Sequence, residues 1–169
     1  MNGMTKHYIG IDNGVTGSIG IIEIKGAVKL SSFSKTPTIK CLSYTKEAQH
    51  IQRIDWGVLV NNLPQTDVIA LIERPMVDPR AFKATQSALR SLEATIIVLE
   101  MLDIEYSYVD SKTWQREFFS SSVIGHDELK KASKEIALKL FPSNGNFIER
   151  HGDGDGLLIA EYLYRMQNR

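Results

Sequence analysis

The fold is decided by residues 8–17, which read YIGIDNGVTG and run directly into a second apolar stretch, SIGII, at residues 18–22. The apolar residues before Asp12 are typical of a buried central strand, and Asn13-Gly14 is a strong turn signal. A carboxylate at the end of such a strand is poorly solvated unless a metal ion, a cation or a donor lies beside it. Asp12 is therefore either a functional acid or a turn residue, and this stretch alone does not separate the two.

A second apolar run, at residues 67–74, also ends in a carboxylate, that of Glu73. Pro75 forces an extended conformation on Arg74, so the predicted strand ends there. If the two apolar strands are parallel neighbours, both acids reach the same edge of the sheet, which is where ligands bind in open α/β sheets. This pairing favours a functional role for Asp12.

Further acids precede the last apolar run, where residues 151–156 read HGDGDG. Because glycine disfavours a helix interior, this segment is predicted to lead into a helix whose first turn holds Asp155, with Asp153 at or before the cap. Helix capping alone would explain both aspartates. Three or four carboxylates at one edge would repel one another without cations, and an all-oxygen set suits Mg²⁺ or Mn²⁺. Two such ions roughly 3.5–4 Å apart activate water and stabilise the leaving oxygen of a phosphodiester.

Hydrophobic periodicity and turn signals predict an α/β fold. We expect strands at 7–12, 18–25, 27–33, 67–74 and 104–109, and helices at 46–63, 81–102, 126–140 and 155–166, with a short helix around Trp114 and loops at 34–45 and 142–146. Three meandering strands followed by alternating strands and helices imply a mixed five-stranded sheet with helices on both faces.

Composition limits the class of protein. The 169 residues are ordinary for one domain, expected to span residues 1–169, and 43% hydrophobic content supports a sizeable core. No apolar run is long enough to span a membrane, and no signal-peptide core is present. Because Cys41 is the lone cysteine, we expect a reducing, cytoplasmic setting and no membrane partner. A net charge of zero does not indicate a nucleic-acid binder, although balance over the whole chain can hide a basic surface.

Four segments, taken in order, resemble the motifs of the RuvC-type Holliday-junction resolvases, especially their short phage and organelle forms. They are residues 9–17, 72–75, 108–115 and 157–162, and the likeness spans nearly the full length. The resemblance implies a ribonuclease H-like fold, a homodimer and Mg²⁺-dependent paired nicking of four-way DNA junctions. It also implies a crossover junction endodeoxyribonuclease of DNA recombination and repair, acting in the cytoplasm, or in the host cytoplasm if encoded by a phage.

The same resemblance assigns the acids. Asp12 and Glu73 match the first two acids of the family, and Asp155 matches the acid just before the last apolar helix. We expect Asp12 to bridge two Mg²⁺ ions, with Glu73 and Asp155 holding one each. Asp153 or His151 completes the catalytic set. His151 could instead contact the scissile phosphate, assist proton transfer or lie on the surface without a role.

Basic and polar side chains in the middle and late parts of the chain are the candidate DNA contacts. The predicted positions are Lys83, Ser87, Arg90, Lys112, Arg116, Lys130 and Lys131. Lysine and arginine at phosphates position DNA without reading its bases. Scattered solvated charges are the alternative interpretation.

Three hydrophobic positions carry further expectations. Trp114 is expected in the core rather than as a platform for base stacking. Phe82 either pries at the junction centre or anchors the start of its helix. The helix at 81–102 is expected to form the dimer seam, with Thr95, Ile97 and Val98 exposed in the monomer.

Two other functions stay open. The glycine-rich first motif also opens the sugar kinases and actin-like ATPases, where it holds a nucleotide phosphate, so a small nucleotide-binding protein is one alternative. A non-catalytic junction-binding module that kept the fold is the other. Cleavage of a labelled four-way junction with and without Mg²⁺ separates these functions from that of a resolvase.

Overall fold

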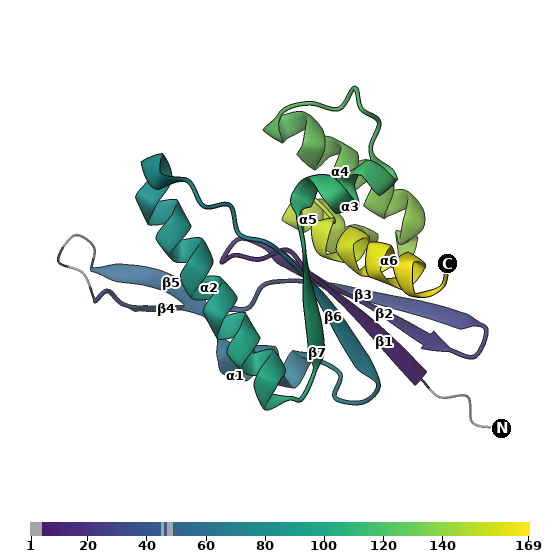
Figure 1. Cartoon of the computed structure of the whole chain (residues 1–169), viewed down its shortest axis with the longest axis horizontal. Coiled ribbons are helices and arrows are strands. Elements are labelled where there is room, and N and C mark those ends of the chain that lie inside the picture. The colour runs from purple at the N-terminus through teal and green to yellow at the C-terminus, as the bar shows by residue number, and fades with distance from the viewer. Residues whose placement is uncertain (1–4, 45, 47–48) are drawn as a thin grey trace.

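The computed structural model describes residues 5–44, 46 and 49–169. Figure 1 shows a central sheet with helices on both sides. The strands are β1 (Thr5–Ile11), β2 (Ser18–Lys25), β3 (Val28–Lys35), β4 (Thr38–Leu42), β5 (His50–Ile54), β6 (Val68–Glu73) and β7 (Glu105–Val109). The α-helices are α1 (Trp56–Asn62), α2 (Phe82–Met101), α3 (Ser111–Phe118), α4 (His126–Leu140), α5 (Gly145–His151) and α6 (Asp155–Gln167), with short 3₁₀ helices η1 (Pro79–Ala81) and η2 (Pro142–Asn144).

The main sheet has five strands in the order β3-β2-β1-β6-β7, so β1 is central. β1 pairs with β2 in the antiparallel sense and with β6 in the parallel sense. Helices α1 and α2 cover one face, and α3 to α6 cover the other (Figure 1). The predicted mixed five-stranded sheet with helices on both faces is confirmed.

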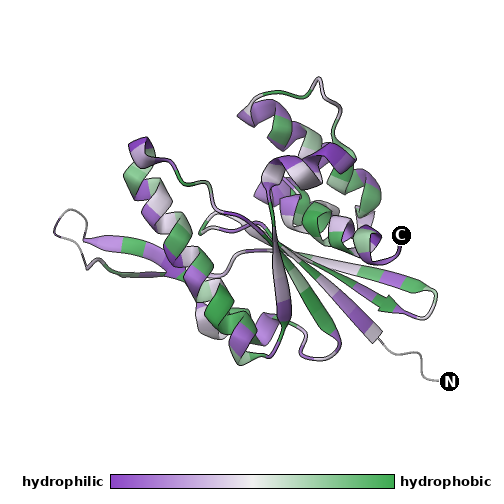
Figure 2. Ribbon diagram, in the orientation of Figure 1, coloured by the Kyte–Doolittle hydropathy of each residue, from purple (hydrophilic) through white to green (hydrophobic). Residues whose placement is uncertain are grey.

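Side chains alternate between the two faces of β1, and helices cover both faces. Ile9 and Ile11 pack against α1 and α2, whereas Tyr8 belongs to the core under α6. Figure 2 shows hydrophobic residues along the middle strands and along α6. The apolar run that predicted a central strand is thus explained by burial on both sides.

Helix α6 lies unusually close to the sheet, and two glycines make this possible. Gly10 of β1 pairs directly with Gly20 of β2, and both face α6. A Cβ atom on Gly10 would lie 2.1 Å from the backbone nitrogen of Ala160, and one on Gly20 would lie 2.4 Å from that of Leu157. This backbone-to-backbone packing brings the start of α6 to the end of β1.

The predicted helix at 46–63 is wrong in its first half, and the predicted loop at 34–45 is wrong in part. Strands β4 and β5 form a separate antiparallel hairpin, and α1 begins only at Trp56. The side chain of Asp55 caps α1 by accepting a hydrogen bond from the backbone N–H of Val58 at 3.2 Å. Ile51 and Ile54 fit a helical period, but pairing with β4 decides the conformation. Residues 45, 47 and 48 of these two predictions lie outside the described residues.

Two further expectations are corrected. The segment at 142–146 is not a plain loop, because η2 and the start of α5 occupy it. Of the three residues predicted to be exposed on α2, Thr95 and Val98 are buried against the sheet, with 3% and 0% exposure, and only Ile97 is exposed. Within residues 5–44, 46 and 49–169, no helix combines the length and apolar character that crossing a membrane requires.

Candidate active site

Asp12 and Glu73 lie side by side at the carboxyl edge of the sheet. Ile11 of β1 pairs with Ile72 of β6, so the next residue of each strand carries one of the two acids. Alternation along β1 and β6 directs both side chains to the face that α6 covers, the face of Tyr8 and Leu71. The predicted convergence of these two carboxylates is present in the structure.

The turn between α5 and α6 brings two more acids to this edge. His151 ends α5, Gly152 takes the left-handed conformation at φ 99°, and Gly154 precedes the first residue of α6, Asp155. Asp153 therefore lies before the cap, as predicted, and only 5% of it is exposed. Carboxylate oxygens of Asp12, Asp153 and Asp155 all lie within 4.8 Å of one another.

Hydroxyl groups hold the start of α6 in place. Ser133 of α4 donates a hydrogen bond to Asp155 Oδ1 and accepts one from the backbone N–H of Gly154 at 3.1 Å. Ser18 Oγ accepts from the backbone N–H of Gly156 at 3.1 Å, which ties α6 to the first residue of β2. Neither serine was predicted as a site residue, and a single buried serine gives no sequence signal.

Glu73 lies beside the three aspartates and has its own partner. The indole Nε1–H of Trp114 donates to Glu73 Oε2 at 2.6 Å, and Trp114 is fully buried. The expectation that Trp114 belongs to the core is confirmed, but its contact with an acid was missed. A signal existed, because a buried tryptophan N–H usually finds an acceptor.

Three of the acids, Asp12, Glu73 and Asp155, are destabilised as carboxylates by burial and by neighbouring acids. Burial raises the pKa of Asp12 well above its ordinary value, and repulsion from Asp155, Glu73 and Asp153 adds to this effect. Burial, together with Asp153, raises the pKa of Asp155 to about 7, although the hydrogen bond from Ser133 opposes the rise. Burial also raises the pKa of Glu73, against the hydrogen bond from Trp114. Such a group of acids is typical of a functional site.

Two basic side chains approach the cluster through Asp153. Lys130 Nζ lies 3.8 Å from Asp153 Oδ2, and His151 Nε2 lies 3.4 Å from Asp153 Oδ1. His151 is mostly buried, and its ring meets that of Phe33 edge-on at 5.5 Å between centroids. Lys130 was predicted as a DNA contact, and the structure places it at the acid cluster with half of its side chain exposed.

The other predicted DNA contacts lie on three helices. Lys83, Ser87 and Arg90 belong to the first half of α2, Lys112 and Arg116 belong to α3, and Lys131 belongs to α4. Lys83, Lys112, Arg116 and Lys131 are exposed, whereas Ser87 and Arg90 are half-buried. The first turns of α2 and α4 lie on the same side of the molecule (Figure 1).

No protein-family model matches the chain, and no curated protein sequence matches it. Solved structures do match. "T. thermophilus RuvC in complex with Holliday junction substrate" is 17% identical, with a TM-score of 0.52 over 96% of this chain and 96% of that one. "Thermus thermophilus RuvC structure" is 18% identical, with a TM-score of 0.50 over 97% of each chain. The fold is that of RuvC. The RuvC-like architecture that the four sequence motifs predicted is therefore present over nearly the whole chain.

Proposed function

We propose that the chain is a Mg²⁺-dependent endonuclease that nicks four-way DNA junctions. The observation that carries the proposal is the cluster of Asp12, Asp153 and Asp155 beside Glu73 on a RuvC fold. One of the matched RuvC structures is a complex with Holliday junction substrate, which supports branched DNA as the substrate class. The reaction would be hydrolysis of a phosphodiester, and the enzyme would be a crossover junction endodeoxyribonuclease.

The acid cluster fits hard divalent cations. Its donors are all carboxylate oxygens, which suit Mg²⁺ or Mn²⁺ rather than zinc. Burial, and then repulsion between the carboxylates, raises the pKa of Asp12 and of Asp155, and bound cations would offset both effects. Asp12, Glu73, Asp153 and Asp155 would hold two ions. When bound, such a pair supplies a water of lowered pKa and stabilises the leaving oxygen.

The residues around the acids would orient them. Trp114 and Ser133 each donate one hydrogen bond, to Glu73 and Asp155 respectively, so both carboxylates have defined rotamers. We assign the fourth acid to Asp153, since its carboxylate lies in the cluster. His151 would orient Asp153, because its ring is held against Phe33 and its Nε2 approaches Asp153 Oδ1. Lys130, next to the opposite oxygen, would be placed to contact a phosphate.

Four-way junctions have pairs of equivalent strands, so a homodimer with two acid clusters suits them. On α2, Leu89, Ile97 and Met101 are 45%, 47% and 62% exposed and fall on one helical face. We propose this stripe as the dimer contact in place of Thr95 and Val98. A monomeric mass at micromolar concentration would contradict it.

The experiment that tests the proposed function compares Asp12→Asn with Asp103→Asn. Asp103, at φ 54° before β7, is distant from the carboxyl edge, and asparagine tolerates its left-handed conformation. With Mg²⁺, Asp12→Asn should abolish cleavage of a labelled four-way junction, whereas Asp103→Asn should cut as the wild type does. Both variants should still bind the junction without metal.

The outcomes separate the three functions. Wild-type cleavage by Asp12→Asn would contradict the metal site. Metal-free junction binding by a wild type that cuts nothing would favour the non-catalytic module. A rise in the unfolding temperature with ATP, and no junction binding, would favour the nucleotide-binding protein.

A further inference from the structure

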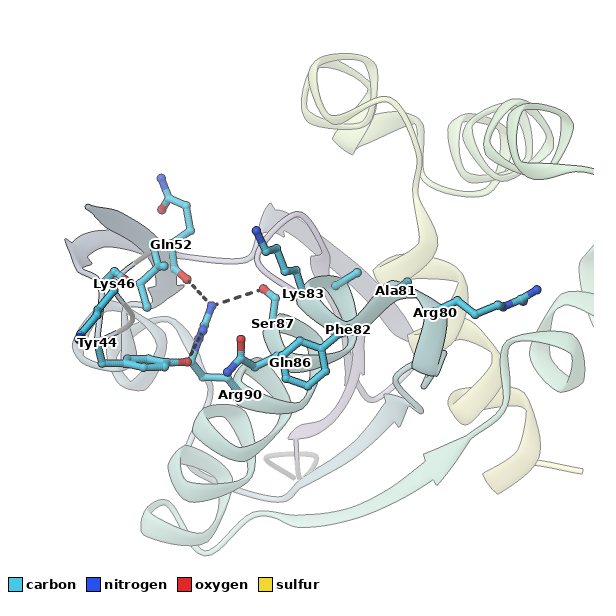
Figure 3. A pocket seen from close by; sticks show the side chains of 13 residues that line it. Tyr44, Lys46, Gln52, Arg80, Ala81, Phe82, Lys83, Gln86, Ser87 and Arg90 are labelled. Atoms are coloured by element: carbon cyan, nitrogen blue, oxygen red, sulfur yellow. Dashed lines mark hydrogen bonds between the residues drawn. The ribbon is translucent and has the colours of Figure 1, made fainter. Parts of the chain in front are cut away.

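A groove of about 880 Å³ lies between the β4–β5 hairpin and the first turns of α2. The hairpin side contributes Tyr44 and Gln52, and the helix side contributes Phe82 and Ser87 (Figure 3). We call it the hairpin groove. It is separate from the acid cluster, and three of the predicted DNA contacts, Lys83, Ser87 and Arg90, line it.

The lining of the hairpin groove attracts anions. It includes Lys46, Arg80, Lys83 and Arg90, and none of its lining residues in the described part of the chain is acidic. Arg80 is paired with Asp78, and Figure 3 shows its side chain pointing away from Lys83 and Arg90, so these two and Lys46 are the basic groups that face the groove. This concentration of basic residues is local, because the whole chain has zero net charge. An anionic polymer is therefore the partner that the electrostatics favour.

Two aromatic rings are exposed in the same place. Tyr44 on the hairpin side is 63% exposed, and Phe82 at the start of α2 is 69% exposed. Single exposed apolar side chains are common, but two rings on the walls of one groove form the kind of patch that marks a binding site. Rings among basic side chains are the combination by which proteins bind unpaired nucleic-acid strands, since bases stack on the rings and phosphates meet the cations.

Arg90 joins the two walls of the hairpin groove. Its guanidinium donates to Tyr44 Oη at 2.7 Å and to the backbone carbonyl of Gln52 at 3.1 Å, and it lies 5.8 Å from the centroid of the Tyr44 ring. Figure 3 shows these bonds running from α2 to the hairpin. Arg90, which the sequence predicted as a DNA contact, thus positions Tyr44. The ring is held in place before any ligand binds, which reduces the entropic cost of binding.

The hairpin groove leads toward the acid cluster. A second cavity, of about 310 Å³, is lined by Asn13, Glu73 and Arg74 at the carboxyl edge. It shares Ala81 and Ala84 with the hairpin groove, so the two cavities adjoin. A strand lying in the hairpin groove can therefore continue to Glu73.

We infer that the hairpin groove binds an unpaired DNA strand next to the cleavage site, with bases stacked on Phe82 and Tyr44. In a duplex the faces of the bases are covered by their neighbours, so exposed aromatic rings stack on unpaired bases rather than on paired ones. The inference rests on the proposed function, because the branch point of a bound junction would supply the strand with unpaired bases. The chain would accordingly prefer branched DNA that carries unpaired nucleotides beside the branch.

The test measures metal-free binding, so that nothing is cut. The probes are a fluorescein-labelled oligothymidylate of roughly 12 nucleotides, a branched junction with an unpaired gap, and a fully paired duplex, all at one salt concentration. Phe82→Ala should weaken binding of the first two probes about tenfold and leave duplex binding unchanged. The matched control is Phe147→Ala, because Phe147 is 56% exposed on α5, away from the hairpin groove. It should bind all three probes as the wild type does.

A second variant keeps the inference testable by a different signal. Phe82→Trp should retain the affinity for oligothymidylate, and its added tryptophan fluorescence should be quenched on binding. Equal losses on all three probes for Phe82→Ala, or no loss on any, would overturn the inference. If the wild type cuts junctions while Phe82→Ala binds as the wild type does, the inferred role of the hairpin groove is wrong and the proposed function is unaffected. If Phe82→Ala loses affinity but the wild type never cuts junctions, the proposed function is wrong and strand binding by the hairpin groove is supported.

Discussion

Replacing Trp114 by phenylalanine tests whether the indole N–H positions Glu73. The bond between Nε1 and Glu73 Oε2 is 2.6 Å long, and Trp114 has 0% exposure. Phenylalanine keeps an aromatic ring but removes the donor at a position that water does not readily reach. The Glu73 carboxylate then loses a hydrogen bond to a charged group, worth about 1.5–3 kcal/mol. This loss should raise the pKa of Glu73, since the bond now opposes the effect of burial.

The loss should appear mainly in metal affinity. Removing a hydrogen bond that orients a metal-binding carboxylate typically weakens metal binding by about 10–100-fold, which equals about 1.4–2.7 kcal/mol and agrees with the value of the bond itself. Calorimetric titration with Mn²⁺ should show this decrease for Trp114→Phe. The Mg²⁺ concentration that gives half-maximal junction cleavage should rise by the same factor, whereas the rate at saturating Mg²⁺ should fall less.

Loss of packing is the competing explanation, and two controls address it. Phe119→Leu removes a ring that packs edge-on against Trp114 at 5.6 Å between centroids and leaves the bond to Glu73 in place. It should lower the unfolding temperature and keep the metal affinity. In a Glu73→Gln background, Trp114→Phe should change metal affinity far less than it does in the wild type. An unchanged Mn²⁺ affinity for Trp114→Phe, or an equal loss in both backgrounds, would refute a positioning role.

Three other predictions follow from the acid cluster, the glycine pair and the basic side chains. Because the folded pKa of Asp155 is raised to about 7 from 3.8, the folded protein binds more protons than the unfolded chain between these values. The free energy of unfolding without metal should therefore fall as the pH rises from about 4.5 to about 7, by at most about 1.4 kcal/mol per pH unit for each proton. Chemical denaturation should show a flatter profile for Asp12→Asn, and an unchanged slope would contradict the coupling. Gly10→Ala should unfold the protein or destabilise it by more than about 3 kcal/mol, since its Cβ would overlap the backbone of α6, whereas Gly57→Ala in α1 should be neutral or stabilising in the same assay. Metal-free junction binding should weaken steeply with salt, and a slope of log affinity against log salt near zero would exclude phosphate contacts.

The acids at strand ends could be predicted because the information is local. An apolar run ending in Asp12 or Glu73 marks a buried strand and its terminus, and a sheet gathers the ends of parallel strands at one edge. The start of α6 could be predicted for a similar reason, since the glycines around Asp153 and Asp155 exclude a helix interior. The approximate ends of the elements were enough, because Asp12 directly follows β1, Glu73 ends β6 and Asp155 begins α6.

The parts that failed depend on contacts between distant segments. The isoleucines of β5 satisfy a helical period as well as a strand, and only pairing with β4 separates the two. Asp55 was a usable signal for the start of α1, because aspartate is a preferred N-cap residue. The role of Arg90 was out of reach, since its partners on the hairpin side are about 40 residues away in the sequence. The same holds for Thr95 and Val98, whose burial depends on which face of α2 the sheet selects.

The glycine pair and the acid cluster belong to one arrangement. Gly10 and Gly20 let the backbone of α6 lie directly on β1 and β2, and this approach places Asp155 next to Asp12. A larger residue at either position would push α6 outward and separate the carboxylates, which would relieve their repulsion. The fold therefore holds the acids together although their charges oppose it, and the closeness is set by backbone packing rather than by attraction between the side chains. Such a cluster is assembled before a cation binds, so the free energy of metal binding is not reduced by the cost of bringing the carboxylates together.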